Sequence, residues 1–223
     1  MMDFEAARTK MVDNQIRTTD VTSHSVLSAF LTVPREAFVS ADLKPLAYID
    51  EDLQVAPAKD GNPPRYIMEP SPLAKLVQLA AITKDDVVLE IGCGAGYAAA
   101  ILSQVAGSVV AVECDGTLAT NATATLSELG YDNVAVVTGE LEKGYAGEGP
   151  YDVIFINGAV EEVPEALLSQ LHEGGRLVAV VGYGNAARAR LYVRAHGVSS
   201  FSEHFNTSVK PLPGFRKAAE FVF

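Results

Sequence analysis

Three glycines at alternate positions follow a short apolar run in the segment Val88-Leu-Glu-Ile-Gly-Cys-Gly-Ala-Gly-Tyr97. Such a run predicts a buried parallel strand, and the residues after the glycines predict a helix. Gly92 and Gly94 allow a tight turn and leave no side chain between the backbone and a ligand. The N-terminus of the following helix directs free N–H groups into the crevice beyond the strand. This turn is therefore a candidate cofactor site.

Two carboxylates accompany the glycine turn. Glu113 lies 21 positions after Gly92, at the end of the next predicted strand, where it can accept hydrogen bonds from both ribose hydroxyls of a nucleoside. Glu90 lies two positions before Gly92, where it would repel a pyrophosphate and attract a sulfonium cation that carries an α-ammonium group. The third glycine, Gly96, makes the spacing G-x-G-x-G, whereas dinucleotide-binding proteins have G-x-G-x-x-G. These features predict S-adenosylmethionine as the cofactor, in preference to NAD.

Further residues are expected to line the same cofactor site. Glu140 follows Gly139 after the third predicted strand, where an adenine amino group is expected, and an exposed loop carboxylate is the alternative. Asn157 ends the fourth predicted strand in the sequence Ile-Asn-Gly-Ala, which differs from the Asn/Asp-Pro-Pro-Tyr/Phe of methyltransferases that act on amino groups of bases. Cys93 and Cys114 lie in apolar segments at this site and lack metal-binding spacing. We interpret both as reduced thiols and predict no metal site.

Strands and helices alternate through the rest of the chain. Apolar runs that predict strands lie at 87–92, 109–113, 133–137, 151–157 and 174–182, and helices are predicted from Leu73, through Leu102, at 117–129 and at 164–171. This alternation is typical of an α/β fold with a doubly wound, mostly parallel sheet. We expect a Rossmann-like S-adenosylmethionine-dependent methyltransferase core.

The segments on either side of this alternation have different patterns. Residues 4–31 predict two helices, the second ended by Pro34, and residues 40–70 are rich in proline and glycine and predict irregular structure. Within them, AKDGNPPR at 58–65 predicts an exposed loop. The tail from about residue 188 alternates like antiparallel strands, with Phe-Val-Phe at 221–223. We therefore expect an N-terminal helical extension over 1–70, packed on a core over 71–223.

Composition limits the partners that this chain can have. Its 223 residues are 48% hydrophobic and 20% charged, which is enough apolar surface for a self-sufficient core. The net charge of −11 disfavours nucleic acid and anionic lipid as partners. The segment MMDFEAARTK lacks the apolar region of a signal peptide, and no run of about 18 apolar residues could span a membrane. We expect a cytoplasmic protein.

Five segments form a further pattern, in chain order: MVDNQIR at 11–17, AFLTVPREAFV at 29–39, AYIDEDL at 47–53, VLEIGCGAGY at 88–97 and NGAVEEVPEALLSQLHEGGRLVAVVG at 157–182. In this order they resemble the protein-L-isoaspartate (D-aspartate) O-methyltransferases. The resemblance implies a Rossmann-like sheet with an N-terminal helical addition. It also implies methyl transfer from S-adenosylmethionine to a carboxylate of an abnormal aspartyl residue in a protein or peptide.

The resemblance breaks at one segment, where the family carries Gly-Gln-Thr-Ile-Ser-x-Pro and its serine lies beside the reacting carboxylate. Anchored on Pro70, the chain has Tyr66 at the threonine position and Met68 at the serine position. Methionine cannot donate a strong hydrogen bond. Arg65 or Tyr66 could bind the carboxylate instead, and the alternative is that Arg65 is a solvated loop residue. The chain is thus either an isoaspartyl methyltransferase or a diverged relative that methylates another acceptor or binds the cofactor without turnover.

Overall fold

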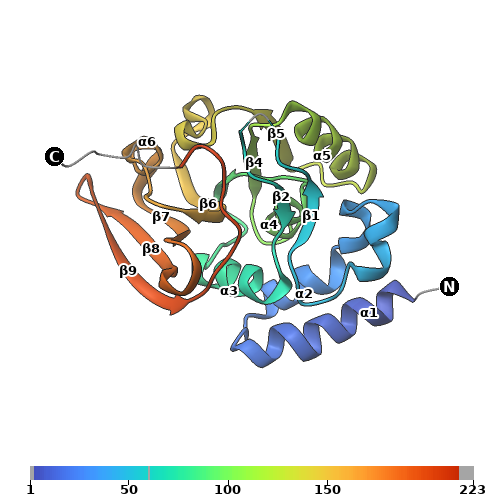
Figure 1. The fold of residues 1–223 in the computed structure, drawn as a ribbon. Coiled ribbons are helices and arrows are strands. Elements are labelled where there is room, and N and C mark those ends of the chain that lie inside the picture. Colours follow the sequence, from blue (N-terminus) through green and yellow to red (C-terminus); the bar gives the residue numbers. More distant parts are fainter. Residues whose placement is uncertain (1–2, 60, 216–223) are drawn as a thin grey trace.

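A seven-stranded sheet forms the centre of the structure, a computed structural model that describes residues 3–59 and 61–215 (Figure 1). The strand order is β5-β4-β3-β6-β7-β8-β9; strands β3 to β7 run parallel, and β8 and β9 add an antiparallel hairpin at one edge. The strands are β3 (Val87–Ile91), β4 (Ser108–Glu113), β5 (Val134–Thr138), β6 (Tyr151–Val160), β7 (Leu171–Val181), β8 (Arg188–Ala195) and β9 (Val198–Asn206). The predicted α/β class and mostly parallel sheet are confirmed.

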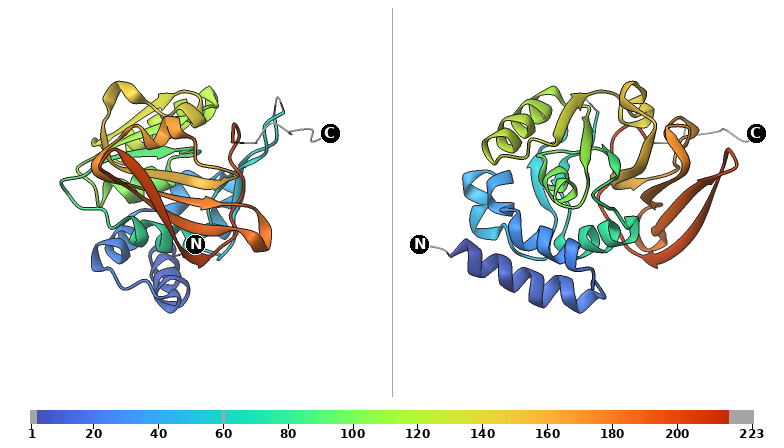
Figure 2. Two further views of the ribbon diagram at one scale, coloured as in Figure 1. Left: turned by 90° about the vertical axis from the view of Figure 1, so that its left-hand side faces the viewer. Right: turned by 180° about the vertical axis from the view of Figure 1, so that it is seen from behind.

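Helices cover both faces of this sheet, because side chains alternate along each buried strand. Val88 and Val109 share one hydrophobic cluster with the N-terminal helices, whereas Leu89 and Val110 share the other with α6. Helices α1, α2 and α3 lie side by side below the sheet in Figure 1 and again in the view from behind (Figure 2). The helices are α1 (Phe4–Met11), α2 (His24–Thr32), α3 (Pro70–Ala80), α4 (Tyr97–Ser103), α5 (Gly116–Glu128) and α6 (Glu165–Leu168).

The N-terminal segment is packed onto the helix that starts at the glycine turn. Tyr97, the first residue of α4, is 1% exposed and meets the rings of Phe30 and Phe38 edge-on, with ring centroids 6.3 and 5.7 Å away. The guanidinium of Arg35 lies 4.8 Å from the centroid of the same ring. These aromatic and cation–π contacts hold the start of α4 in place.

The topology places a crevice at the carboxyl ends of the central strands. From β3 the chain runs to β4 and β5 on one side, and it returns on the other side of β3 as β6. Ligands of open α/β sheets bind at this point of reversal. A small antiparallel sheet of β1 (Leu53–Ala56) and β2 (Arg65–Ile67) lies beside the same strand ends.

Three predictions about segments need correction. Residues 40–70 are not irregular throughout, because Leu53 pairs with Ile67 across the β1–β2 sheet. Arg65, predicted at the end of an exposed loop, begins β2 and is 7% exposed. The helix predicted at 164–171 stops at Leu168, since Leu171 already begins β7. Strand pairing between distant segments, which the local pattern does not encode, is the physical reason.

The two N-terminal helices are confirmed, with a turn of π-helix and a turn of 3₁₀-helix between them at Val12–Ile16 and Arg17–Thr19. Val33, the residue before Pro34, is extended, as the proline ring requires, and α2 ends there. The predicted Phe-Val-Phe strand at 221–223 lies outside the described residues.

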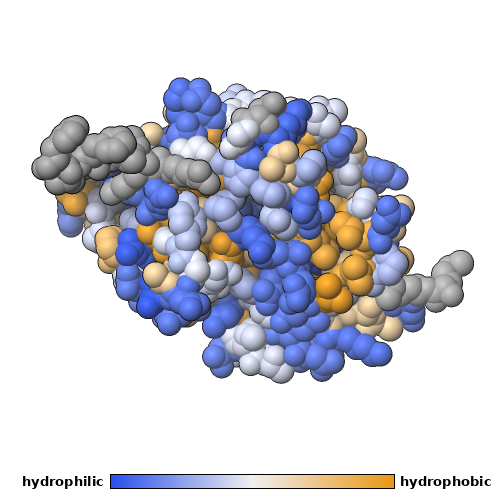
Figure 3. Space-filling view, in the orientation of Figure 1, coloured by the Kyte–Doolittle hydropathy of each residue, from blue (hydrophilic) through white to orange (hydrophobic). Residues whose placement is uncertain are grey.

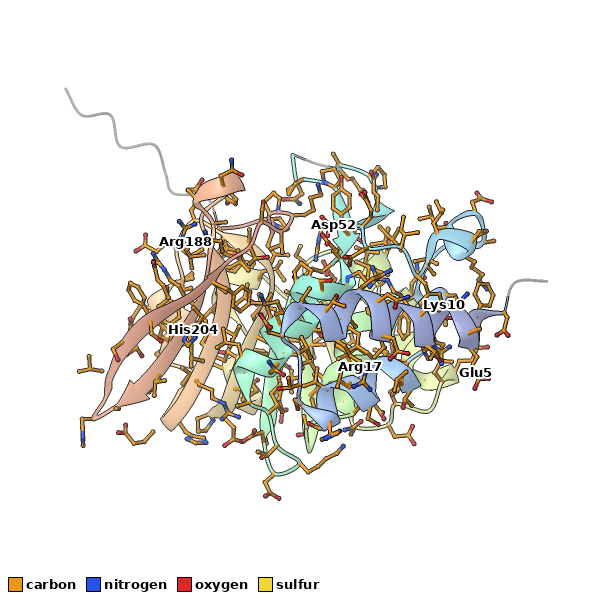
Figure 4. The ribbon with its side chains drawn as sticks, turned by 90° about the horizontal axis from the view of Figure 1, so that it is seen from below. Glu5, Lys10, Arg17, Asp52, Arg188 and His204 are labelled. Carbon is orange, nitrogen blue, oxygen red and sulfur yellow. The ribbon has the colours of Figure 1, made fainter. Side chains whose placement is uncertain are left out.

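Hydrophilic residues cover much of the face that Figure 3 shows, with hydrophobic residues exposed between them. Arg188 and His204 lie on the C-terminal hairpin, at the opposite end of the molecule from Glu5 and Lys10 on the N-terminal helix (Figure 4). Within residues 3–59 and 61–215, no helix combines the length and apolar character that crossing a membrane requires.

Candidate active site

The glycine turn ties the end of β3 to β4. The backbone N–H groups of Gly92 and Cys93 both donate to the carbonyl oxygen of Val112, at 2.9 and 3.2 Å. Gly92 and Gly94 have φ values of +84° and +56°, a region that side-chain-bearing residues rarely adopt. A Cβ atom added to Gly94 would lie 3.9 Å from its nearest neighbour, the carbonyl oxygen of Tyr66. The protein thus leaves room for close approach of a ligand to this backbone.

Gly96 has a different purpose in the same turn. Its φ is +92°, and an added Cβ would lie 3.2 Å from both Ala122 and Leu126 of α5. The third glycine therefore permits close packing of α4 against α5, and it sets the direction in which α4 leaves the turn.

Glu113 is fully buried at the end of β4 and lies directly over the turn. Its Oε2 accepts a hydrogen bond of 2.7 Å from the backbone N–H of Gly94, and its Oε1 accepts one of 3.0 Å from that of Asp115. The guanidinium Nη1 of Arg65 donates to the same Oε1 at 2.5 Å. The carboxylate predicted to bind ribose is thus positioned by backbone N–H groups and paired with an arginine.

Glu90 is also fully buried; it pairs with Phe155 of β6, and Asn157 lies two positions farther along that strand. Oε1 of Glu90 accepts a hydrogen bond of 3.0 Å from Nδ2 of Asn157, whereas Oε2 is buried and has no partner among the described residues. Burial, and to a lesser extent the charge of Glu113, raises the pKa of Glu90 to about 8. A buried acid with an unpaired oxygen fits a ligand that brings its own ammonium group.

A cavity of about 360 Å³ lies between the β1–β2 connection and the turn from β4 into α5. Arg65, Cys114, Asp115 and Gly116 are among the residues that line it. Its size is in the range of ligand-binding pockets, and it borders the Arg65–Glu113 ion pair. A nucleoside held by Glu113 would extend into this cavity.

The segment that departs from the family's sequence contains Arg65 and continues through Tyr66 and Met68. A small cavity of about 20 Å³ is lined by Arg65, Tyr66, Met68 and Asn157, among others. Met68 is 5% exposed and belongs to the main hydrophobic cluster. The Nζ atom of Lys210 lies 5.3 Å from the centroid of the Tyr66 ring. Arg65, Tyr66 and Met68, the three residues that the sequence suggested for acceptor binding, thus border the same small cavity.

Sequence reasoning missed the chain segment that covers the glycine turn. The backbone around Leu212 pairs with Ala159, whose N–H donates to the carbonyl of Lys210 at 2.9 Å and whose carbonyl accepts from the N–H of Leu212 at 3.0 Å. A Cβ added to Gly92 would lie only 2.7 Å from Cδ2 of Leu212. The turn signal Pro-Leu-Pro-Gly at 211–214 is the sequence feature that could have drawn attention to this segment.

Glu69, an acidic group beside Met68, is only partly ionised near pH 7. Burial, and then the nearby Asp50, Asp52 and Glu51, raise the pKa of Glu69 to about 7. Asp52, labelled in Figure 4, accepts a hydrogen bond of 3.0 Å from the backbone N–H of Glu69 and lies 3.8 Å from Nζ of Lys210. The partial neutralisation of Glu69 lowers its repulsion of an anionic acceptor.

The remaining predicted residues occupy the rim of the site. The backbone N–H of Gly139 donates to the carbonyl of Glu113 at 3.0 Å, which places the end of β5 beside that of β4. The side chain of Glu140 is 61% exposed and pairs with Nζ of Lys143 at 2.7 Å, so its contact with adenine stays a prediction.

Both cysteines are free thiols, Cys93 buried and Cys114 half-buried. Burial raises the pKa of Cys93 well above its ordinary value and that of Cys114 to about 11, so neither is a ready nucleophile. They contribute packing beside the turn and beside Glu113.

Comparison with known sequences assigns the chain to a protein family. The sequence model of the protein-L-isoaspartate (D-aspartate) O-methyltransferases matches residues 6–213. A protein-L-isoaspartate O-methyltransferase of Koribacter versatilis is 40% identical over 80% of this chain and 78% of its own. One of Rhodopseudomonas palustris is 38% identical over 91% of this chain and 90% of its own.

Solved structures agree with the sequence matches. A protein-L-isoaspartate O-methyltransferase superimposes with a TM-score of 0.80 at 31% identity, covering 93% of this chain and 66% of that one. A structure from Plasmodium falciparum, described as a putative enzyme of this type in complex with S-adenosyl-L-homocysteine, has a TM-score of 0.76 at 15% identity. It covers 95% of this chain and 99% of that one. The second likeness supports the fold.

Proposed function

Because the chain belongs to the protein-L-isoaspartate (D-aspartate) O-methyltransferase family, we propose that it methylates the carboxylate of isoaspartyl residues in proteins, with S-adenosylmethionine as methyl donor. The resident residues fit this cofactor. Glu113 can accept hydrogen bonds from a ribose, and Glu90 can pair with an α-ammonium group. Gly94 lets the cofactor approach the backbone.

One observation carries the cofactor assignment: two fully buried carboxylates, Glu90 and Glu113, lie at the ends of adjacent parallel strands. A pyrophosphate beside these two acids would oppose their ionised forms, whereas a cationic ligand favours the ionised forms and relieves the cost of burying them. The unpartnered Oε2 of Glu90 marks the place for that cation.

The mechanism needs positioning more than proton transfer. S-adenosylmethionine supplies an electrophilic methyl group on a sulfonium. An isoaspartyl carboxylate has an ordinary pKa near 4, so it is already a nucleophile at pH 7 and no general base is required. The protein must hold the carboxylate oxygen in line with the methyl group and exclude water, which can contribute roughly 7–11 kcal/mol. Leu212, which covers Gly92, is placed to exclude water.

The acceptor is recognised beside β2. Met68 cannot donate a hydrogen bond to the carboxylate. Arg65 and Tyr66 border the same small cavity as Met68, and a guanidinium can bind a carboxylate through two parallel hydrogen bonds. We assign carboxylate binding to Arg65 first and to Tyr66 second. The expected cytoplasmic location and the exclusion of nucleic acid stay predictions.

The direct test is a methyl-release assay with an isoaspartyl peptide, and the same peptide with ordinary aspartate is the control. We expect release from the isoaspartyl peptide alone. Calorimetry with S-adenosylhomocysteine should give binding that Glu113→Ala weakens at least tenfold, since roughly 1.5–3 kcal/mol per charge-assisted hydrogen bond is lost.

Tight S-adenosylhomocysteine binding without methyl release would favour the second hypothesis, a diverged relative with another acceptor or without turnover. The observation that favours it is Met68, buried at the position of the family's serine. Failure to bind S-adenosylhomocysteine would contradict both hypotheses.

A further inference from the structure

The ion pair between Arg65 and Glu113 occupies the oxygen that a ribose needs. A carboxylate offers about four acceptor positions. On Glu113, Oε1 accepts from Nη1 of Arg65 at 2.5 Å and from the N–H of Asp115 at 3.0 Å, and Oε2 accepts from the N–H of Gly94 at 2.7 Å. The thiol of Cys114, a weak donor, lies 3.5 Å from Oε1. One strong acceptor position remains, whereas a ribose diol donates two hydrogen bonds.

Of the three strong contacts, the one to Arg65 is the one that can be released. The N–H groups of Gly94 and Asp115 belong to the backbone of the glycine turn and of the start of α5. The guanidinium is at the end of a long side chain, and its Nη2 would lie 3.3 Å from a Cβ added to Gly92. It therefore extends over the glycine turn, where the cofactor must approach.

A released guanidinium at this position needs another anion. Arg65 is 7% exposed, and a buried charge without a partner is strongly unfavourable. The side chain borders two cavities: the larger one beside Cys114 and Asp115, and the small one beside Met68 and Asn157. It thus lies between the proposed cofactor site and the proposed acceptor site.

We propose that Arg65 is a positioning residue that exchanges one carboxylate for another: ribose displaces it from Glu113, and it then binds the carboxylate of the acceptor. Binding is consequently ordered, with the cofactor first and the isoaspartyl peptide second. This inference rests on the proposed function. It gives a reason why a chain with Met68 at the serine position has an arginine three residues before it.

Calorimetry on the intact protein tests both halves of the exchange. With wild type, an isoaspartyl peptide should bind at least tenfold more tightly in the presence of saturating S-adenosylhomocysteine than without it. Arg65→Ala should bind S-adenosylhomocysteine equally tightly or more tightly, because the competing partner of Glu113 is gone. Its peptide affinity should fall at least tenfold and should no longer depend on S-adenosylhomocysteine.

Arg190→Ala is the matched control, since it removes an arginine from another ion pair, 2.8 Å from Glu203 on the C-terminal hairpin. It should bind both ligands as wild type does. Arg65→Lys keeps the charge and serves as a second variant if Arg65→Ala does not fold. It should retain part of the dependence of peptide affinity on S-adenosylhomocysteine.

The cofactor measurement and the peptide measurement can each overturn the inference. A tenfold loss of S-adenosylhomocysteine affinity in Arg65→Ala would mean that Arg65 helps to hold the cofactor. An unchanged peptide KM in Arg65→Ala, with methyl release intact, would overturn the inference and leave the proposed function standing. Absence of methyl release and of peptide binding in wild type would instead remove the proposed function, and the exchange with it.

Discussion

Asn157 and Glu90 are joined across the two central strands of the sheet. Nδ2 of Asn157 donates a hydrogen bond of 3.0 Å to one carboxyl oxygen of Glu90, and the other oxygen has no partner within residues 3–59 and 61–215. Asn157 therefore fixes the orientation of the carboxyl group and leaves one oxygen for a ligand. Burial of this group costs stability that ligand binding can recover.

Replacement of Glu90 by glutamine should stabilise the protein and weaken cofactor binding. The pKa of Glu90 is about 8 in the folded protein and near 4.5 when unfolded, so the unfolded state binds fewer protons between these values. Stability therefore falls as pH rises from about 5 to 8. Glu90→Gln should remove that fall, with a gain of up to about 4 kcal/mol at pH 8 by denaturant unfolding.

The same variant should bind S-adenosylhomocysteine at least tenfold more weakly, since a neutral amide cannot pair with the ammonium group. Glu128→Gln, on the exposed side of α5, is the control and should change neither property. A stability difference from wild type that stays constant between pH 5 and 8 would contradict the role given to Glu90.

Substitution of Gly94 by alanine should abolish cofactor binding in a folded protein. The substitution strains a backbone with φ of +56°, at a cost of about 1–2 kcal/mol, and the added methyl group has space within the protein. It would intrude where the cofactor meets the backbone. Gly130→Ala is the matched control, because its φ is +77° and an added Cβ meets nothing within 4 Å.

Both glycine variants should lose similar stability in thermal unfolding, and only Gly94→Ala should lose the stabilisation that S-adenosylhomocysteine provides. If Gly94→Ala retains that stabilisation, the glycine turn is not the cofactor site.

Restoring the family's residues at positions 66 and 68 should raise activity. Tyr66→Thr with Met68→Ser adds a hydroxyl beside the acceptor, and one hydrogen bond to a charged group, worth roughly 1.5–3 kcal/mol, corresponds to about tenfold or more in kcat/KM. The buried Met68 packs in the core, so its truncation should cost about 2–5 kcal/mol of stability.

Tyr66→Thr with Met68→Ala creates nearly the same cavity without the hydroxyl, and it isolates the hydrogen bond from the loss of packing. Methyl release from an isoaspartyl peptide, measured at 25 °C, should increase in the serine variant alone. Robust wild-type activity that both double variants destroy would show that Met68 and Tyr66 already serve the acceptor.

The pair of Asp152 and His172, at the amino ends of β6 and β7, should make a pH-dependent contribution to stability. Nε2 of His172 contacts Oδ1 of Asp152, and this hydrogen bond raises the pKa of His172. The contribution is therefore full below about pH 6.5 and disappears as pH rises through the raised folded pKa. Because His172 is 40% exposed, solvent screening limits it to about 1 kcal/mol.

His172→Gln should thus be less stable than wild type at pH 5.5 and similar to it at pH 8.5, by denaturant unfolding. Methyl transfer should not change, because His172 lies at the amino end of the strands, away from the glycine turn. His204→Gln, on the C-terminal hairpin, is the control. A destabilisation that is equal at both pH values would exclude the charged pair as its cause.

The parallel sheet and the glycine turn with its two acids were readable from the residues because they depend on local patterns. A buried parallel strand needs a continuous apolar run, and a tight turn at φ above zero needs glycine. Glu90 and Glu113 follow from the same logic, since the residue that ends each strand must lie at the same edge of the sheet. Spacing along the chain is sufficient for these inferences.

The surroundings of Arg65 and Leu212 were not readable in this way. Arg65 lies 48 positions from Glu113, in a stretch whose prolines and glycines predict a loop, and the pairing of β1 with β2 places it in the site. Leu212 reaches Gly92 across 120 positions, through backbone pairing with Ala159. Contacts of this kind depend on which distant segments meet when the core packs. The sequence by itself therefore determined the sheet, the glycine turn and its two acids, whereas the tertiary structure decided which charge lies against Glu113 and which side chain covers the turn.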